Sequence, residues 1–397
     1  MTDSPQVTVV QPGARHNFAL ARFLQRQGML RRLYTDFALA EDSIAARCVA
    51  ALPPGPLASK LRRRMVAELP AAKVISDRRP LADVLRETWS GQGGRTPRWS
   101  IRQTDREASD IVYTQYFAGG AALRRQFGSG TKVVSDVFIM PSTHRIVNEE
   151  AARFPEWGEA AIPDAQVAAY DAHTWSMFEQ SDALFCPAQS VADDVAGYDS
   201  RLAAKCVLVP YGSSVRFPGE GRPVAGRVLF AGSVQLRKGP QYLKQAADLL
   251  AGSEPSIEIV VAGGVSEPAR RRLEGGNVRV LGHLSRDEMA REFARADLFA
   301  FPTLAEGSAG VVLEAMAAGL PVVTTRSAGV AFTEGRSGIV VAERDPQGLA
   351  DAILRIVSDR DMRAAMSAHA RKEAGLYDDV RWCETFVGAL RKVHAEA

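Results

Sequence analysis

The sequence predicts an α/β protein made of two doubly wound parallel sheets in tandem. Short apolar runs of strand length alternate with longer helical patterns along all 397 residues, and this alternation is typical of βα units. A stretch rich in proline and glycine, from Pro210 to Gly226, interrupts the pattern, which then restarts. The chain length also corresponds to about two domains of ordinary size.

Each expected strand is an apolar run bounded by turn residues or by a helical pattern. In the first half these runs are residues 7–10, 30–35, 110–114, 132–137, 183–186 and 206–209. In the second half they are residues 227–231, 257–262, 278–281, 297–301, 321–325 and 338–341. Helical patterns cover residues 18–27, 144–153, 165–180, 346–357, 361–374 and 380–395. Pro155 ends the second of these helices, because proline lacks an N–H group and clashes with the preceding turn.

This order of elements predicts a first domain over residues 1–210 and a second domain over residues 211–375. A last helix within residues 376–397 would cross back to the first domain. The turn-rich stretch after Pro210 is the expected linker. Because ligands of open parallel sheets bind at the carboxyl ends of the strands, we expect the ligand in a cleft between the two domains.

The composition excludes several classes of protein. The net charge of +3 is too small to indicate nucleic-acid binding. The N-terminus has no basic segment and does not predict a secretory signal, and no apolar run reaches the roughly 18 residues that span a bilayer. The four cysteines, Cys48, Cys186, Cys206 and Cys383, have no metal-ligand spacing and indicate reduced thiols in a cytoplasmic protein.

Residues 301–325 carry the strongest functional signal: a strand, a glycine-containing turn, a helix of small residues and a second strand. Glu306 stands before the helix and Glu314 within it, with seven residues between them. Carboxylates accept hydrogen bonds from sugar hydroxyls, and the N–H groups at a helix start bind phosphate oxygens. The segment therefore predicts a ligand with both hydroxyls and phosphates. By residue type alone, both glutamates could equally be ordinary surface charges.

The start of that helix is the expected phosphate site. Ser308 is the predicted N-cap, which would leave the N–H groups of Ala309, Gly310 and Val311 for anionic oxygens. Gly310 also removes a side chain that could block the ligand.

A cationic turn follows the first strand of the second half, in the sequence FAGSVQLRKG. Gly232 and Gly239 permit close approach of the backbone. Arg237 and Lys238 place two cations at the carboxyl end of a strand, which suits a diphosphate. Taken alone, an Arg-Lys pair of this kind is more often a solvated basic turn.

Together, these motifs resemble those of a known family. The chain is similar to the GT-B glycosyltransferases of the retaining family 4 type, also called group 1 glycosyltransferases, most strongly over residues 210–341. The resemblance is carried, in order, by VPYG, FAGSVQLRKG, VVAGG, LGHL and the E-x7-E element of Glu306 and Glu314. It implies a GT-B fold, in which two Rossmann-like domains face each other across a cleft, and a glycosyl-transferring enzyme.

The resemblance also implies roles for individual residues. Glu306 would contact sugar hydroxyls of the donor, and Glu314 would bind the ribose hydroxyls. Lys238 would bind the diphosphate and stabilise the leaving group, assisted by the N–H groups near Gly310, while His283 would lie beside the base. Transfer would proceed with retention and would need no metal and no cofactor, because cations and amides stabilise the departing charge.

One position departs from the family pattern. The glycine that corresponds to Gly232 is usually followed by arginine, whereas Ser233 follows it here. Arg237 could supply the missing charge from another place on the loop.

Three residues of the first half are candidates for the same site. Gly13 lies at the first strand–helix turn, where family members often have two glycines. Asp136 ends a strand and His144 opens the next helix, and the resemblance implies that a histidine or an aspartate from this region lies by the reacting sugar. The sequence leaves open which of the two it is. Glu149 and Glu150 are interpreted as surface charges of the helix, with contact to the acceptor as the alternative.

The leading hypothesis is a cytoplasmic retaining glycosyltransferase that uses a nucleotide-diphosphate sugar donor and a carbohydrate or lipid-linked acceptor, in cell-surface or exopolysaccharide synthesis. The alternative is a non-catalytic partner protein that binds sugar nucleotides, which Ser233 and the single glycine of the first turn would fit. No G-x-G-x-x-G follows the first strand, which argues against a dinucleotide oxidoreductase.

Basic residues cluster at Lys60 and at residues 62–64. They could rest on an anionic membrane surface, at the inner face of the membrane, and suit a lipid-linked acceptor. A solvated helix face is the simpler interpretation.

Overall fold

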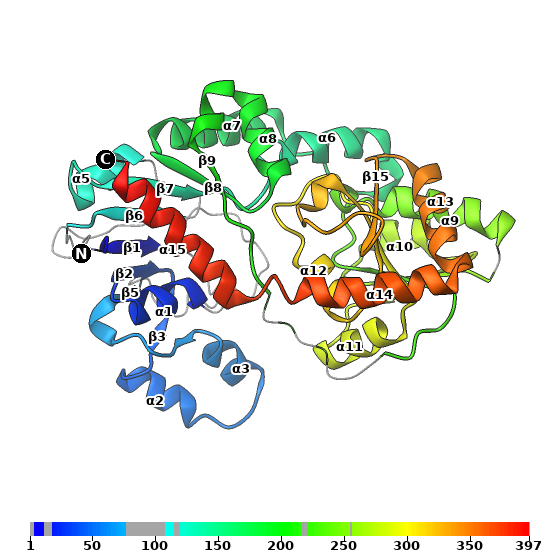
Figure 1. Cartoon of the computed structure of the whole chain (residues 1–397), viewed down its shortest axis with the longest axis horizontal. Helices are drawn as coiled ribbons and strands as arrows, with labels where there is room; N and C mark the ends of the chain where they lie inside the picture. Colours follow the sequence, from blue (N-terminus) through cyan, green and yellow to red (C-terminus); the bar gives the residue numbers. More distant parts are fainter. Residues whose placement is uncertain are drawn as a thin grey trace.

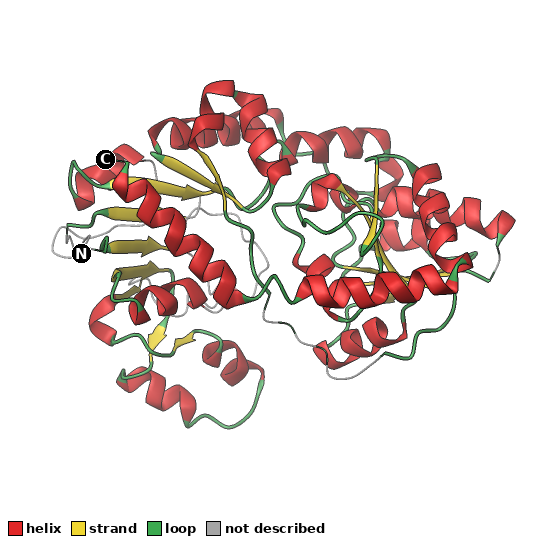
Figure 2. Ribbon diagram, in the orientation of Figure 1, coloured by secondary structure: helices red, strands yellow, loops and turns green. Residues whose placement is uncertain are grey.

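Two parallel sheets, each with helices beside it, make up the molecule (Figures 1 and 2). The structure is a computed structural model. It describes residues 4–11, 18–76, 108–114, 120–213, 215, 217, 221–254 and 256–396. The predicted α/β class with doubly wound sheets is confirmed, and the strands common to prediction and structure begin and end within a residue of the predicted positions.

The first sheet has the strand order β5-β2-β1-β6-β7-β8-β9. Its strands are β1 (Val7–Val10), β2 (Leu30–Thr35), β5 (Val74–Ser76), β6 (Ile111–Thr114), β7 (Lys132–Asp136), β8 (Ala183–Cys186) and β9 (Cys206–Leu208). The helices of this half are α1 (Ala19–Arg26), α2 (Ile44–Ala50), α3 (Pro56–Arg62), α5 (Gly120–Phe127), α6 (Thr143–Arg153), α7 (Asp164–Gln180) and α8 (Gln189–Tyr198). The predicted elements do not include β5 or the helices α2 and α3. These two helices lie between a short strand, β3 (Leu39–Ala40), and its partner strand, β4 (Met65–Val66).

The second sheet has the strand order β12-β11-β10-β13-β14-β15. Its strands are β10 (Arg227–Ala231), β11 (Glu258–Ala262), β12 (Val278–Gly282), β13 (Leu298–Phe301), β14 (Val322–Thr325) and β15 (Gly338–Val341). Its helices are α9 (Pro240–Ser253), α10 (Glu267–Leu273), α11 (Arg286–Arg295), α12 (Gly310–Ala317), α13 (Pro346–Ser358) and α14 (Arg360–Ala374). In chain order both sheets begin in the middle, extend to one edge and then restart beside the first strand, which is the arrangement of dinucleotide-type folds.

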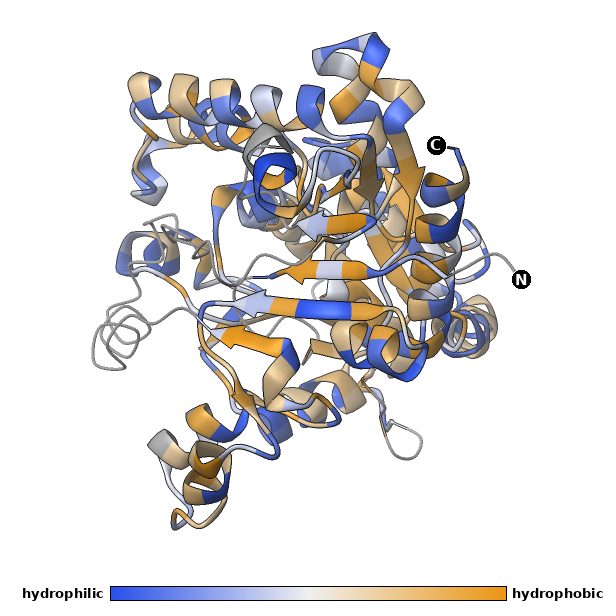
Figure 3. Ribbon diagram, turned by 90° about the vertical axis from the view of Figure 1, so that its left-hand side faces the viewer, coloured by the Kyte–Doolittle hydropathy of each residue, from blue (hydrophilic) through white to orange (hydrophobic). Residues whose placement is uncertain are grey.

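The central strands of both sheets are buried on both faces, which explains their continuous apolar sequences, whereas the edge strands β5, β9, β12 and β15 are partly exposed. All of the side chains of β10 and β13 are at most 5% exposed. In Figure 3 the strands have mainly hydrophobic colours, whereas the helices show both colours because one side of each faces water.

The last helix, α15 (Asp379–Ala395), lies across the first sheet (Figure 1). Its Trp382, Phe386 and Leu390 belong to the same core as Val7 of β1, and the ring of Phe386 packs edge-on against Tyr113 at 4.8 Å. The chain therefore passes between the sheets twice. The two passages lie side by side, because the N–H of Ser213 donates to the carbonyl oxygen of Tyr377 at 2.7 Å.

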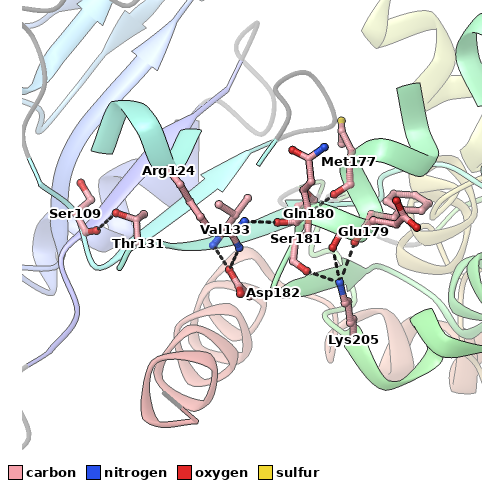
Figure 4. A network of polar contacts seen from close by, with 12 residues as sticks. Ser109, Arg124, Thr131, Val133, Met177, Glu179, Gln180, Ser181, Asp182 and Lys205 are labelled. Atoms are coloured by element: carbon pink, nitrogen blue, oxygen red, sulfur yellow. Dashed lines mark hydrogen bonds and ion pairs between the residues drawn. The ribbon is translucent and has the colours of Figure 1, made fainter. Parts of the chain in front are cut away.

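A polar network holds the end of α7 to the first sheet (Figure 4). Lys205 donates to the carbonyl oxygens of Phe178, Glu179 and Ser181 at 2.8–3.2 Å. Asp182 accepts from Arg124 and from the N–H of Val133, both at 2.7 Å. These groups lie before or at the beginning of strands, whereas ligands bind where the strands end. We therefore infer that the network stabilises the fold and does not bind a ligand. No helix in the part of the chain that the structure describes is long and apolar enough to cross a membrane.

Candidate functional site

The site lies where the chain reverses its direction across the second sheet. β10 pairs in parallel with both β11 and β13, and the chain continues first to β11 and later to β13. The loops that follow β10 and β13 therefore separate in opposite directions and leave a crevice at the carboxyl end of the sheet. The cationic turn follows β10 and Glu306 follows β13, so the fold brings these two sequence motifs together.

Backbone contacts hold the cationic turn against the loop after β13. The carbonyl oxygen of Arg237 accepts from the N–H of Leu304 at 2.7 Å and from the hydroxyl of Thr303 at 3.1 Å. The turn is one short helix, η6 (Leu236–Lys238), that ends at Gly239 with a φ of 75°. Its position relative to Glu306 is therefore fixed by the backbone.

The charges at this position form a compact cluster. A guanidinium nitrogen of Arg237 donates to the Glu306 carboxylate at 2.9 Å and to the carbonyl oxygen of Ala305 at 2.9 Å. The Lys238 ammonium lies 3.7 Å from the same carboxylate oxygen. Burial lowers the pKa of Lys238, and Glu306 partly offsets this effect. Two cations and one carboxylate leave an excess positive charge, which suits a diphosphate.

Gly232 gives the Lys238 ammonium the space that it occupies. The φ of Gly232 is 137°, and a Cβ atom there would lie 3.2 Å from Nζ of Lys238. Ser233, at the position where the family usually has arginine, is exposed. One guanidinium nitrogen of Arg237 binds Glu306 and the neighbouring backbone, and the expectation that Arg237 supplies the missing charge stays a prediction. Arg237 orients the carboxylate, and its predicted contact with the donor also stays a prediction.

Replacing Gly239 by alanine is expected to displace the cationic turn. The φ of 75° disfavours any residue with a Cβ, and that atom would lie 1.9 Å from the carbonyl oxygen of Pro302. Loss of thermal stability together with loss of donor binding is the expected result. Gly252→Ala is the matched control, because a Cβ at Gly252 meets nothing within 4 Å. Unchanged donor affinity in G239A would contradict the role of the turn.

The start of α12 differs from the prediction in two ways. The N-cap is Ala309, not Ser308, and no side chain caps the helix. The N–H of Ala309 is already used, because it donates to the carbonyl oxygen of Ala328 at 2.8 Å. The N–H groups of Gly310 and Val311 have no acceptor among the described residues. The predicted anion site at this helix start therefore narrows to these two groups.

Glu314 is half-buried on α12 and has no hydrogen-bond donor among the residues that the structure describes. Burial raises the pKa of Glu314, with a smaller opposing effect from Arg286. A buried carboxylate without a partner is costly for a protein to keep. This carboxylate is therefore available to ligand hydroxyls, as the sequence predicts, although its contact with ribose stays a prediction.

Replacing Glu314 by glutamine is expected to stabilise the ligand-free protein near neutral pH. Because the folded pKa is raised above the ordinary value of 4.5, the folded state binds the proton more tightly than the unfolded state. The stability contributed by this group is therefore present at low pH and is lost as the pH rises through the raised pKa. The melting temperature of E314Q should exceed that of the parent at pH 7 and vary less from about pH 4.5 upward. Donor affinity should fall about 10- to 100-fold, since hydrogen bonds to a charged acceptor are lost; identical pH dependence in both proteins would contradict the assignment.

The first half reaches the site through the loop after β7. A Cβ on Gly307 would lie 1.8 Å from the carbonyl oxygen of Phe138, so the backbone of Gly307 contacts that of the loop directly. Asp136, two residues before Phe138, is 2% exposed and accepts from the hydroxyl of Tyr211 at 2.9 Å. Asp136 is therefore only two residues from the backbone contact with the site. Its carboxylate, however, is hydrogen-bonded to Tyr211, which belongs to the segment that connects the two sheets.

His144 is held by residues of α7 and α8. Its Nε2 lies 2.8 Å from the Asp171 carboxylate, which also accepts from the hydroxyl of Tyr198 at 2.6 Å. Arg145 lies over the Tyr198 ring at 4.5 Å. No contact joins His144 to the Lys238–Glu306 cluster among the described residues. His283 is exposed in the loop after β12, and Gly13 lies outside the described residues.

Sequence reasoning missed one group beside the site, Glu150 of α6. This carboxylate is 0% exposed, whereas the sequence indicated a surface charge. It accepts from Gln241 and Tyr242 of α9 at 2.8 Å and from Arg344 at 2.7 Å. These three hydrogen-bond donors belong to the second half of the chain, and nothing in the sequence near Glu150 indicates them; a fourth partner, Arg153 of α6, lies 4.0 Å away.

The segment from α6 to residue 159 packs against the second sheet, as Figure 1 shows for α6. Ala151 and Trp157 belong to the core of the second sheet. Glu159 accepts from the N–H of Leu236, the first residue of the cationic turn, at 2.7 Å. We call residues 143–159 the α6 bridge, because the segment belongs to the first half of the sequence and holds the turn of the second.

A hollow of about 380 Å³ lies between the two halves, next to the start of α12. Its walls include Ala188, Ser190 and Tyr211 from the first half and Ser308, Leu313 and Arg326 from the second. Within the described part of the chain, no group of three or more His, Cys, Asp or Glu side chains could hold a metal ion.

Comparison with known proteins supports the fold of the whole chain and identifies a family domain in its second half. Two solved structures superpose along almost the whole chain. The Anabaena protein HepE, solved in complex with UDP and glucose, has 13% identity, a TM-score of 0.59 and coverage of 98% of this chain and 100% of its own. Sucrose-phosphate synthase from Thermosynechococcus elongatus has 17% identity, a TM-score of 0.61 and coverage of 99% and 100%. The fold is therefore GT-B, as the sequence predicts.

Residues 225–359 match the family model described as "Glycosyl transferases group 1". The D-inositol 3-phosphate glycosyltransferase of Corynebacterium urealyticum is 36% identical over 215 residues, which are 47% of this chain and 51% of the relative. The chain thus spans about half the length of these curated relatives. The resemblance to group 1 glycosyltransferases is confirmed, and the second half of the chain carries the domain of that family.

Proposed function

We propose that the protein is a retaining glycosyltransferase that moves a sugar from a nucleotide-diphosphate donor to a carbohydrate or lipid-linked acceptor. The observation that carries the proposal is the cluster of Arg237, Lys238 and Glu306 at the crevice of a group 1 domain. In HepE the same fold has been solved with UDP and glucose. A donor of this type combines a diphosphate with sugar and ribose hydroxyls, which are the groups that this crevice can bind.

In the proposed reaction, the bond between the anomeric carbon and the diphosphate oxygen breaks, and its electrons leave with the nucleoside diphosphate. An acceptor hydroxyl oxygen forms the new bond to the anomeric carbon on the same face, and its proton passes to the departing diphosphate oxygen. Lys238 and the N–H groups of Gly310 and Val311 stabilise the negative charge that develops on the leaving group. Glu306, oriented by Arg237, holds the sugar hydroxyls.

The proposal requires no metal ion, because side-chain cations and backbone N–H groups stabilise the leaving group. The loop after β7, with Asp136, and the start of the α6 bridge, with His144, are the proposed acceptor side. We infer a cytoplasmic location, with peripheral contact at the inner face of the membrane, and a role in cell-surface or exopolysaccharide synthesis for a lipid-linked or carbohydrate acceptor.

The test is a panel of nucleotides and nucleotide sugars, read first as thermal shifts and then as release of nucleoside diphosphate with candidate acceptors. The proposal expects stabilisation by one class of nucleotide diphosphate sugar and acceptor-dependent release. Stabilisation without release with any acceptor would favour the alternative, a non-catalytic protein that binds sugar nucleotides. Absence of any stabilisation by nucleotide diphosphates would contradict both.

A further inference from the structure

The helices α2 and α3 form a small unit at the lower edge of the first half in Figure 1. They connect β3 to β4, which pair only with each other and not with the main sheet. Their own small core consists of Leu39, Ala46 and Val49, with Phe37, Leu61 and Met65 packed against it. Figure 3 also shows this unit projecting away from the sheet. We call it the α2–α3 unit (residues 39–66).

The α2–α3 unit has an unbalanced charge. It contains five Lys or Arg, at residues 47, 60 and 62–64, against the two acidic residues Glu41 and Asp42, so this small unit alone has a net charge of +3, equal to that of the whole chain. Arg64 is neutralised by Asp36 at 3.0 Å. Arg47 and Arg63 are exposed and have no acidic partner among the described residues. The unit therefore presents unpaired positive charge to its surroundings.

Large apolar side chains stand beside these cations. Ile44 is 80% exposed, the largest exposed fraction among the large hydrophobic residues that the structure describes, and Leu52 is 36% exposed. They lie at the start of α2 and just after its end, and the residues from Ala51 to Gly55 that follow α2 are all exposed. Exposed apolar side chains among cations are typical of surfaces that enter the boundary between lipid headgroups and acyl chains.

A basic hollow lies near the backbone of Leu52, because Arg62, one of its lining residues, donates to the carbonyl oxygen of Leu52 at 2.5 Å. It has a volume of about 370 Å³ and is lined by Arg22, Ser59, Arg62, Arg63, Met65 and Ala67. Nε of Arg22 is buried and has no acceptor among the described residues. Guanidinium groups that converge on one space are well suited to phosphate oxygens.

We propose that the α2–α3 unit docks on the surface of an anionic lipid bilayer. Ile44 and Leu52 enter the interface, Arg47 and Arg63 face the negative surface, and the basic hollow takes the phosphate of one lipid headgroup. This proposal names the surface for the membrane contact inferred above. It does not depend on glycosyl transfer, so failure of docking would leave the donor site and its tests unaffected.

Vesicle flotation of the full chain tests the proposal without donor or acceptor. The protein should bind vesicles that contain phosphatidylglycerol and phosphatidylcholine, bind pure phosphatidylcholine vesicles weakly, and dissociate as the salt concentration rises. Because each cation near the surface contributes about fivefold to partitioning, Arg47→Gln with Arg63→Gln should lower binding about 25-fold. Ile44→Ser should also lower binding, at any salt concentration.

The matched control is Arg271→Gln with Arg272→Gln, which removes two exposed arginines from α10 in the second half. This control changes the net charge equally and should retain vesicle binding. Equal loss in the control and in the α2–α3 variant would show non-specific attraction and overturn the proposal. Stabilisation of the protein by inorganic phosphate without any binding to the anionic vesicles would identify a soluble phosphate ligand instead and would also overturn it. Equal melting temperatures of the variants confirm that folding is not the cause.

Discussion

Replacing Lys238 by alanine is expected to lower turnover by about 10²- to 10³-fold, the usual effect of removing one preorganised group that stabilises transition-state charge. The side chain of Lys238 is 15% exposed, and its ammonium group lies 3.7 Å from the Glu306 carboxylate. It therefore keeps a fixed position at the crevice and acts on the leaving group with little screening by water. The measurement is the rate of nucleoside diphosphate release with the donor and acceptor that the panel identifies.

The expected change is mainly in turnover, because the developing charge is larger in the transition state than in the bound donor. Lys238→Arg keeps the charge but changes its shape and position, so it should recover part of the rate. Lys244→Ala removes a lysine from α9 that pairs with Asp248 on the helix surface, and it should leave turnover unchanged. Normal turnover in K238A would contradict the proposal that Lys238 stabilises the negative charge of the leaving group.

The donor crevice was predictable from the sequence because strand order places its parts. In a doubly wound sheet, β10 and the fourth strand of the same sheet are neighbours, so the loops after them must meet. Arg237 and Glu306 are 69 residues apart, yet their positions after two such strands were enough to predict one shared site; the hydrogen bond between them was not predicted. Each motif marks a backbone position that follows a strand. The order of the strands in the sheet then determines which of these positions lie close together in space.

The details of the helix start were not predictable in the same way. Ser308 has the chemistry of an N-cap, but the helix begins one residue later. The N–H of Ala309 instead bonds to Ala328, which follows the next strand. N-cap preferences consider only the residues at the helix start itself. Here the helix start is determined by a hydrogen bond to Ala328, in a loop elsewhere in the chain. The same limit applies to His144, whose partner Asp171 comes from another helix.

Glu150 shows the limit most clearly, because its neighbours in sequence indicate an exposed helix face. Glu149 and Glu150 are adjacent and both bind Arg344, at 2.6 and 2.7 Å. The side chain of Glu149 is 55% exposed, and that of Glu150 is 0% exposed. The difference arises because Gln241 and Tyr242 cover one glutamate and not the other. Burial and the bond to Glu150 raise the pKa of Tyr242 to about 12, so its hydroxyl remains a donor at physiological pH.

Replacing Glu150 by alanine is therefore expected to lower the free energy of unfolding by about 3–5 kcal/mol, since it leaves buried donors and an arginine without their acceptor. Glu149→Ala should cost less than about 1 kcal/mol, because its ion pair is exposed to water. Urea denaturation of both variants measures the two values. The pair is a close control, since both changes remove one carboxylate from the same arginine.

Removal of the Glu150 carboxylate should also disturb the cationic turn at the donor crevice, because the α6 bridge contacts that turn. Glu159 of the bridge binds the N–H of Leu236, and Gln241 donates both to Glu150 and to the carbonyl oxygen of Leu236. Amide hydrogen exchange of the cationic turn should therefore accelerate in E150A and not in E149A, and the donor should bind E150A more weakly. If E150A lost stability but its turn exchanged as slowly as in the parent, the bridge would hold the two halves together without positioning the cations. If E150A were as stable as E149A, the contacts of Ala151 and Trp157 alone would hold the bridge to the second sheet.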